Sequence, residues 1–198
     1  MKQIDSFVEM CIQKKYVTQD NAPWLRYALE KRIGSLVAFT PLLILGLLIT
    51  NPSTVISFLF SFSLLRTRTN GFHAKTIGKC IVYSILEEIF FLKVLPMTWN
   101  NMIASVALAI SIMLIWTLAP YNHPNMDLSL KEVTACAKSA KWRLGILVCF
   151  LTMLYESGQN QLALGILLGI VMTASTLVVA YCSQITMPEE NDRETEQN

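Results

Sequence analysis

Apolar and polar positions alternate through the first 32 residues, and long apolar segments separated by short polar ones follow. Apolar side chains recur at helical spacing between Ile4 and Ile12, and a second apolar patch lies between Trp24 and Leu29. This periodicity predicts two short amphipathic helices joined by a turn around residues 20–23. We expect them to lie on a membrane surface or to pack beneath a helical bundle.

The remainder of the chain contains six apolar segments. They are Ile33 to Thr50, Ser53 to Leu65, Cys80 to Leu95, Met102 to Ala119, Leu144 to Tyr155 and Leu162 to Cys182. Because a membrane span takes about 20 apolar residues, the pattern predicts an all-α, polytopic integral membrane protein with about six transmembrane helices. The second and fifth segments are short, which fits either re-entrant helices or a locally thinned bilayer.

The first two segments are predicted to form a hairpin rather than one helix. A single helix over residues 33–65 would be about 50 Å long, well beyond a hydrocarbon core of about 30 Å. Asn51, Pro52 and Ser53 supply a turn near its middle.

The placement of the basic residues supports this hairpin. With six helices and the N-terminus inside, every Lys and Arg outside the membrane segments falls on the cytoplasmic side, and Lys93 alone lies within the third segment. The cytoplasmic residues are Lys2, Lys14, Lys15, Arg26, Lys31, Arg32, Arg66, Arg68, Lys75, Lys79, Lys131, Lys138, Lys141, Arg143 and Arg193. This asymmetry follows the positive-inside rule and predicts that both termini are cytoplasmic.

The composition agrees with this class. Of 198 residues, 53% are hydrophobic and only 15% charged, which excludes an ordinary soluble domain, and the net charge of +2 gives no reason to expect nucleic acid as a partner. Five cysteines without Cys-x-x-Cys spacing indicate neither a disulfide framework nor a metal site.

The first residues lack the apolar core of a signal peptide, so we expect the mature chain to keep them. Residues 1–32, 33–182 and 183–198 are predicted to be an interfacial region, a membrane domain and a disordered acidic tail.

A basic island, residues 66–80, holds the candidate chemistry. It contains His73, one of two histidines, and ends at Cys80, near the start of the third membrane helix. Helix amides and nearby cations favour a thiolate there, and a histidine can deprotonate a cysteine. On a straight helix the two residues would be about 10.5 Å apart, so a dyad requires the backbone to fold His73 back near Gly71 or Gly78. From the residues alone, a dyad and an ordinary basic loop both remain open.

The run Arg66-x-x-x-Asn-Gly-Phe-His-Ala, followed by Cys80 in a small polytopic chain, resembles the accessory gene regulator protein B (AgrB) family. Residues 119–124, Ala-Pro-Tyr-Asn-His-Pro, also resemble a loop of that family, and Asn70 departs from its more common glycine. The resemblance implies a membrane cysteine endopeptidase that processes quorum-sensing propeptides, with His73 as general base and Cys80 as nucleophile. It also implies supporting positions at Arg66 and Gly71.

Other polar residues near the island are further candidates. Arg66 is equally consistent with a group that holds a substrate carboxylate or oxyanion and with a topology determinant. Ser84 lies one turn after Cys80 and is predicted to line the site. Glu87 is expected to bind substrate or to form an ion pair, for which Lys93 is a candidate at poor helical spacing.

The sequence-based expectation is therefore cleavage of an AgrD-like, membrane-associated propeptide at the cytoplasmic face of a bacterial cell membrane, without a cofactor or metal. The acyl-enzyme would then cyclise to a thiolactone or lactone, and a homodimer through the N-terminal region is expected in part from the resemblance. Two alternatives remain. One is a non-catalytic peptide exporter or scaffold. The other is a glutamate-type, CAAX-like intramembrane protease using Glu87 and Glu88, although only His123, in a proline-flanked loop, follows them.

Overall fold

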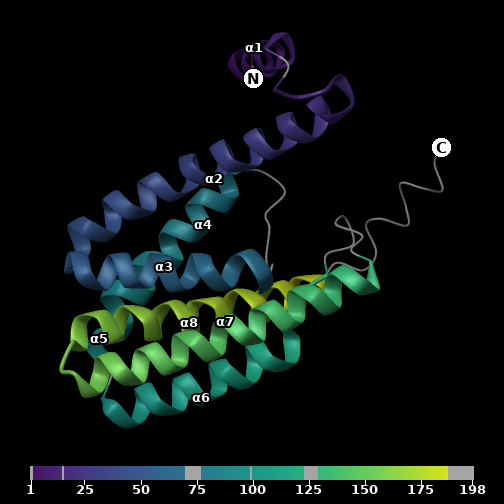
Figure 1. Ribbon diagram of the computed structural model, residues 1–198. Helices are drawn as coiled ribbons and strands as arrows, with labels where there is room; N and C mark the ends of the chain where they lie inside the picture. Colours follow the sequence, from purple (N-terminus) through teal and green to yellow (C-terminus); the bar gives the residue numbers. More distant parts are fainter. Residues whose placement is uncertain (1, 15, 70–76, 99, 123–128, 187–198) are drawn as a thin grey trace. The chain divides into compact units, whose positions relative to one another are not determined.

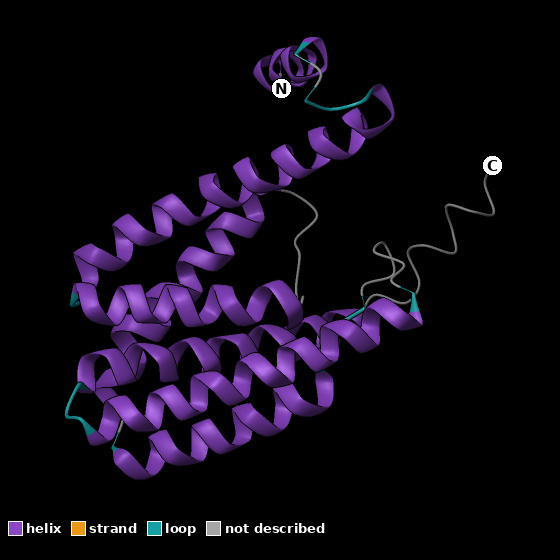
Figure 2. Cartoon of the chain, viewed as in Figure 1, coloured by secondary structure: helices purple, strands orange, loops and turns teal. Residues whose placement is uncertain are grey.

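The computed structural model describes residues 2–14, 16–69, 77–98, 100–122 and 129–186, and gives only the backbone for some helical residues within them. The elements are α1 (Lys2–Gln13), the 3-10 turn η1 (Gln19–Asn21), α2 (Ala22–Ile49), α3 (Pro52–Thr69), α4 (Ile77–Ile89), the π-helical segment η2 (Phe90–Val94), α5 (Leu95–Thr98), α6 (Asn101–Leu118), α7 (Leu130–Glu156) and α8 (Asn160–Thr186) (Figure 1). All regular structure in these ranges is helical, which confirms the predicted all-α class (Figure 2).

The chain divides into two units, Met1–Ile44 and Leu45–Asn198. In the first unit, α1 forms the first predicted amphipathic helix, and Asp5 pairs with Arg26 of α2 at 3.0 Å across exposed surface. The second short amphipathic helix does not exist as a separate element, because α2 runs without interruption from Ala22 to Ile49. Pro23 lies in its first turn, where a missing N–H is tolerated, so nothing ends the helix before the apolar segment.

The predicted hairpin break is confirmed. Helix α2 ends at Ile49 and α3 begins at Pro52, and the Asn51 side chain accepts a hydrogen bond from the Ser53 N–H at 2.9 Å. Proline at the first helical position needs no hydrogen-bond acceptor, which favours a new helix at this point.

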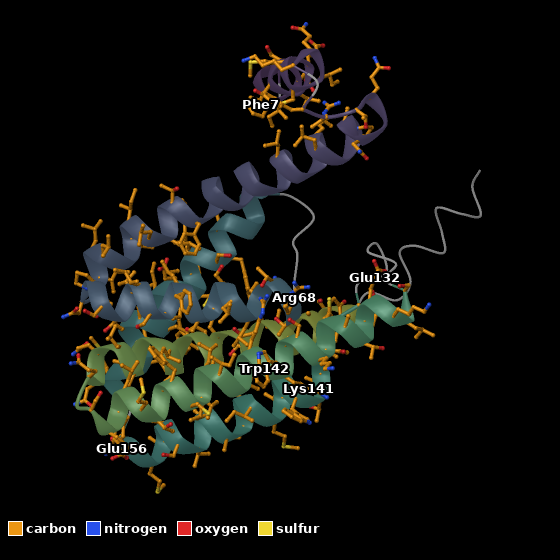
Figure 3. All side chains as sticks on the ribbon, in the orientation of Figure 1. Phe7, Arg68, Glu132, Lys141, Trp142 and Glu156 are labelled. Atoms are coloured by element: carbon orange, nitrogen blue, oxygen red, sulfur yellow. The ribbon has the colours of Figure 1, made fainter. Side chains whose placement is uncertain are left out.

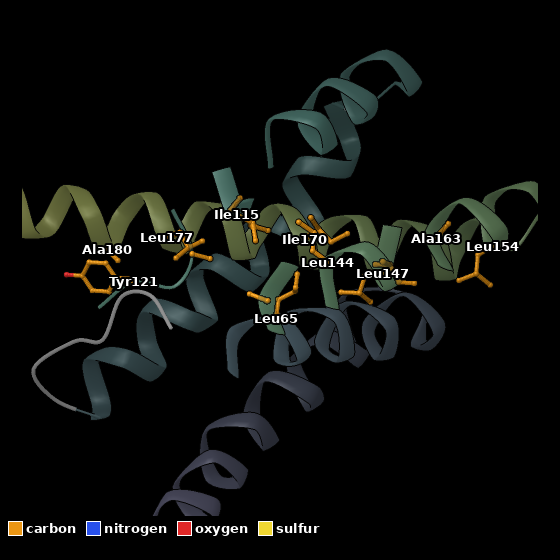
Figure 4. Close-up of a cluster of buried hydrophobic side chains, with 14 residues drawn as sticks. Leu65, Ile115, Tyr121, Leu144, Leu147, Leu154, Ala163, Ile170, Leu177 and Ala180 are labelled. Atoms are coloured by element: carbon orange, nitrogen blue, oxygen red, sulfur yellow. The ribbon is translucent and has the colours of Figure 1, made fainter. Parts of the chain in front are cut away.

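In the second unit, α8 lies against α3, α6 and α7, and these helices enclose the main apolar core. Leu65 of α3, Ile115 of α6, Leu144 of α7 and Ile170 of α8 meet near its centre and are almost completely buried (Figure 4). Each fully buried aliphatic side chain of this kind contributes about 1.5–3 kcal/mol where the alternative is water.

Two described helices are long and apolar enough to cross a membrane, Asn101–Leu118 and Asn160–Ser183. Helix α8 is largely buried, whereas α6 exposes large apolar side chains along its length, Ile103, Val106, Ile110, Met113 and Trp116 among them. Such a surface is typical of a helix that faces lipid. All six predicted apolar segments lie on helical backbone, apart from single end residues, but the count of six spans stays a prediction.

The helices that contain the two short apolar segments are longer than those segments. Helix α3 extends to Thr69, and α7 begins at Leu130, 14 residues before Leu144. At 1.5 Å per residue, the 27 residues of α7 are about 40 Å long. Re-entrant geometry is therefore unnecessary to explain the short apolar pattern.

Candidate functional site

Cys80 is the fourth residue of α4, so it lies in the first turn of that helix. This is where the sequence placed it, and amides at a helix start favour negative charge. Its side chain lies outside the described part of the structure, and so do His73 and Gly71. The predicted folding back of His73 and the geometry of the dyad therefore stay predictions.

Three polar residues of α4 follow Cys80 along one face of the helix, since they lie three, four and seven positions further on. They are Tyr83, Ser84 and Glu87, all half-buried. The Tyr83 hydroxyl donates a hydrogen bond to the Glu87 carboxylate. Sequence reasoning missed Tyr83, although its spacing of four from Glu87 on the Cys80 face was visible.

Arg66 of α3 lies close enough to Glu87 of α4 for their opposite charges to interact. Arg66 lies in the last turn of α3, and its guanidinium group attracts the Glu87 carboxylate. The ion pair of Glu87 stays a prediction, for which Arg66 is a candidate partner on another helix. Lys93, the partner suggested by the sequence, is exposed in η2. It lies six residues after Glu87, a spacing at which two side chains point in different directions on a helix.

Glu88 has different surroundings from its neighbour. Its side chain is 1% exposed, and neither carboxylate oxygen has a hydrogen-bond partner among the described residues. A Cβ added at Gly46 of α2 would lie 2.9 Å from Glu88 Oε1 and 2.7 Å from Val55 Cγ1, so the glycine makes room for the carboxyl group. The described residues contain no group of three or more His, Cys, Asp or Glu that could hold a metal ion.

The last turns of α3 also make contacts with α7. Arg143 Nη1 donates hydrogen bonds to the Leu64 carbonyl and the Thr67 hydroxyl, both at 2.7 Å. The sequence had identified Arg143 only as one of many basic residues, because contacts 76 and 79 residues away leave no local pattern.

Beyond the end of α6, the backbone of Tyr121 is bonded to the end of α3. Its N–H donates to the Thr69 carbonyl at 2.9 Å, and its ring packs edge-on against Tyr181 of α8, with centroids 5.1 Å apart. Tyr181 in turn donates to the Leu118 carbonyl at 3.0 Å. Burial, with a smaller contribution from Tyr181, raises the pKa of the Tyr121 hydroxyl above its ordinary value.

A family model described as "Accessory gene regulator B" matches residues 4–177. No curated protein and no solved structure gives a significant match. The matched range includes Arg66, the island that follows it, and every residue of α4.

Proposed function

Because the chain belongs to the accessory gene regulator B family, whose members act in quorum-sensing propeptide processing, we propose that it is a membrane cysteine endopeptidase for such a propeptide. The observation that carries the proposal is the family match over residues 4–177, with Cys80 in the first turn of α4 inside it. A thiolate is the reactive form of cysteine, and a helix start stabilises it.

In the proposed reaction, His73 removes the proton from Cys80, and the thiolate attacks a peptide carbonyl of the propeptide. The tetrahedral intermediate collapses with cleavage of the C–N bond, and the protonated His73 gives its proton to the leaving amine. The product is an acyl-enzyme thioester and a released C-terminal peptide. Arg66 is suited to bind the oxyanion or a substrate carboxylate, and Gly71 and Ser84 have supporting roles.

The acyl-enzyme then transfers its acyl group to an internal thiol or hydroxyl group of the substrate, which closes a thiolactone or lactone and regenerates the Cys80 thiol. Transfer to a thiol exchanges one thioester for another, so little bond energy is lost. Hydrolysis would compete, and exclusion of water from Cys80 would favour the cyclic product.

The charge distribution of the second unit supports a cytoplasmic site. Arg68 and Lys141 lie near the end of the helices where α3 finishes, and Glu156 lies near the opposite end (Figure 3). The turns at that opposite end, residues 50–51 and 157–159, carry no Lys or Arg. This asymmetry favours an orientation with the Arg66 end facing the cytoplasm.

Cleavage by the purified chain in liposomes, with a propeptide substrate, tests the proposal. We expect Cys80→Ser and His73→Ala each to reduce cleavage by roughly a thousandfold or more while the propeptide still co-purifies. Cys149→Ser is the matched control, because Cys149 is an exposed cysteine of α7 outside the site and should retain full cleavage. Undiminished cleavage by Cys80→Ser would contradict the proposal.

The peptide exporter or scaffold makes the opposite prediction for the same variant. Under that alternative, the basic residues matter through charge alone, so Cys80→Ser would transport or bind the peptide normally and no wild-type cleavage would be detected.

A further inference from the structure

The last two turns of α3 are bonded from two directions by side chain and backbone groups of other elements. Arg143 of α7 donates to the Leu64 carbonyl and the Thr67 hydroxyl, and the Thr67 hydroxyl itself donates to the Leu64 carbonyl at 3.1 Å. The Tyr121 N–H donates to the Thr69 carbonyl. The three acceptors lie within six consecutive residues, so this segment is fixed along its length.

Each of these contacts has a clear physical reason. The last four carbonyl groups of a helix lack intrahelical donors, and Thr69 is the last residue of α3, so the Tyr121 N–H satisfies one of them. A cation near a helix C-terminus also interacts favourably with the helix dipole. Arg143 adds two short hydrogen bonds from one nitrogen, Nη1, whose two N–H groups point in fixed directions in the guanidinium plane, whereas those of an ammonium group rotate freely.

The fixed segment carries a residue of the candidate site. Arg66 lies between Leu64 and Thr67, which both bond to Arg143. The direction of the Arg66 side chain depends on the rotation of this last turn, since successive residues of a helix differ by about 100°. The chain then continues from Thr69 directly into the segment that contains His73.

We propose that Arg143 is a positioning residue for the reaction centre, because it holds the last turns of α3, which carry Arg66. Tyr121 assists through its N–H, which donates to the Thr69 carbonyl. This inference rests on the proposed peptidase function. A cation that only determines topology needs charge alone, whereas the positioning role of Arg143 also needs its two hydrogen bonds to α3.

Arg143→Lys tests the role because it keeps the charge and replaces the planar Nη1 amino group, which donates both hydrogen bonds, with a shorter side chain that ends in a freely rotating ammonium group. We expect kcat for propeptide cleavage to fall about 10- to 100-fold with KM nearly unchanged, because a small misplacement of reacting groups slows the chemical step more than it weakens binding. Lys138→Gln is the control, since Lys138 is exposed on the same helix and its loss removes a charge without touching α3. It should cleave like the wild type.

A second measurement follows Cys80 directly. In a chain with the other four cysteines replaced by serine, the rate of Cys80 alkylation by iodoacetamide is recorded against pH. A misplaced Arg66 would stabilise the thiolate less, so Arg143→Lys should shift the midpoint of this profile to higher pH, whereas Lys138→Gln should not. Thr67→Ala should reproduce part of the effect and add little to Arg143→Lys, since the two groups share one contact.

The outcomes separate the two proposals. Inactive Cys80→Ser together with wild-type kcat and alkylation profile in Arg143→Lys would overturn the positioning role and leave the peptidase intact. The positioning role would also be overturned if Arg143→Lys lost activity only in proportion to its loss of folded protein and kept the wild-type alkylation profile. Undiminished cleavage by Cys80→Ser would remove the function on which the inference rests.

Discussion

Glu87 and Glu88 are adjacent in sequence and have opposite environments. Neighbouring residues of a helix point about 100° apart, so one carboxylate faces Tyr83 and Arg66 while the other enters the space beside Gly46. A carboxyl group buried without a partner is destabilising, whereas one with a donor and a cation is at least partly compensated. The structure therefore favours a functional or structural role for Glu87 and gives Glu88 no described partner to act with.

Glu88→Met tests this distinction. Removal of the unpartnered carboxyl group should raise the free energy of unfolding in detergent micelles by about 1–3 kcal/mol and leave propeptide cleavage intact. The matched variant, Glu87→Met, loses the Tyr83 hydrogen bond and the attraction to Arg66, so it should be less stable than the wild type. Abolished cleavage in Glu88→Met, with normal cleavage in Cys80→Ser, would instead support the glutamate-type protease.

Several site residues could be predicted from the sequence one at a time, and their partners could not. Arg66 was expected from the motif and Glu87 from its depth in an apolar segment, but the interaction of their charges joins two helices and leaves no local pattern. Arg143 illustrates the limit most clearly. Its role follows from two contacts to a distant helix, and in the sequence it is one cation among sixteen Lys and Arg residues.

At the scale of elements, the closest packing is between α3 and α8. Added Cβ atoms at Gly165 and Gly169 of α8 would collide with Ser57 and Ser61 of α3, respectively. Small residues four apart are the usual device for bringing membrane helices close together. At one end of this contact, the Thr54 hydroxyl donates to the Gln161 side-chain oxygen at 2.8 Å.

Gly169→Ala should therefore destabilise the protein by about 1–3 kcal/mol, because the new methyl group meets Ser61 and lies 2.8 Å from the Phe58 carbonyl oxygen. Gly145→Ala is the control. Gly145 is a helical glycine of α7 with nothing within 4 Å of an added Cβ, so alanine there should be neutral or stabilising by up to about 1 kcal/mol. Thermal unfolding in one detergent compares the two, and equal stabilities would show that this contact adjusts without penalty.

The elements themselves could be predicted where a local signal was strong. The break at Asn51 and Pro52 was found correctly, because proline at a helix start is a local effect. The continuation of α2 through residues 22–49 was missed, because a change from amphipathic to wholly apolar pattern suggested a boundary that no helix breaker enforces. The extension of α7 to Leu130 was missed for the same reason, although Ser129 and Glu132 form a capping box there.

At the scale of the whole molecule, the positive charges and the helix lengths are consistent with one orientation. In α7, Lys141 and exposed Glu156 are 15 positions apart. This corresponds to about 22 Å, shorter than a hydrocarbon core of about 30 Å, and it fits a locally thinned bilayer. Lys141 lies over the Trp116 ring, 4.9 Å from its centroid, and such aromatic and basic pairs are common where helices leave the bilayer. We therefore infer that α7 crosses the membrane with its N-terminal part in the cytoplasm.

Cysteine labelling on intact cells tests that orientation. In a chain whose five cysteines are replaced by alanine, Gln159→Cys adds an exposed thiol at the turn between α7 and α8, and Lys138→Cys adds one near the other end of α7. A membrane-impermeant maleimide should label the first in intact cells and the second only after permeabilisation, because Lys and Arg favour the cytoplasmic side. Labelling of both in intact cells would show that α7 does not cross. Labelling of Lys138→Cys alone would reverse the orientation and place the Arg66 end of α3, with the proposed reaction centre, outside the cell.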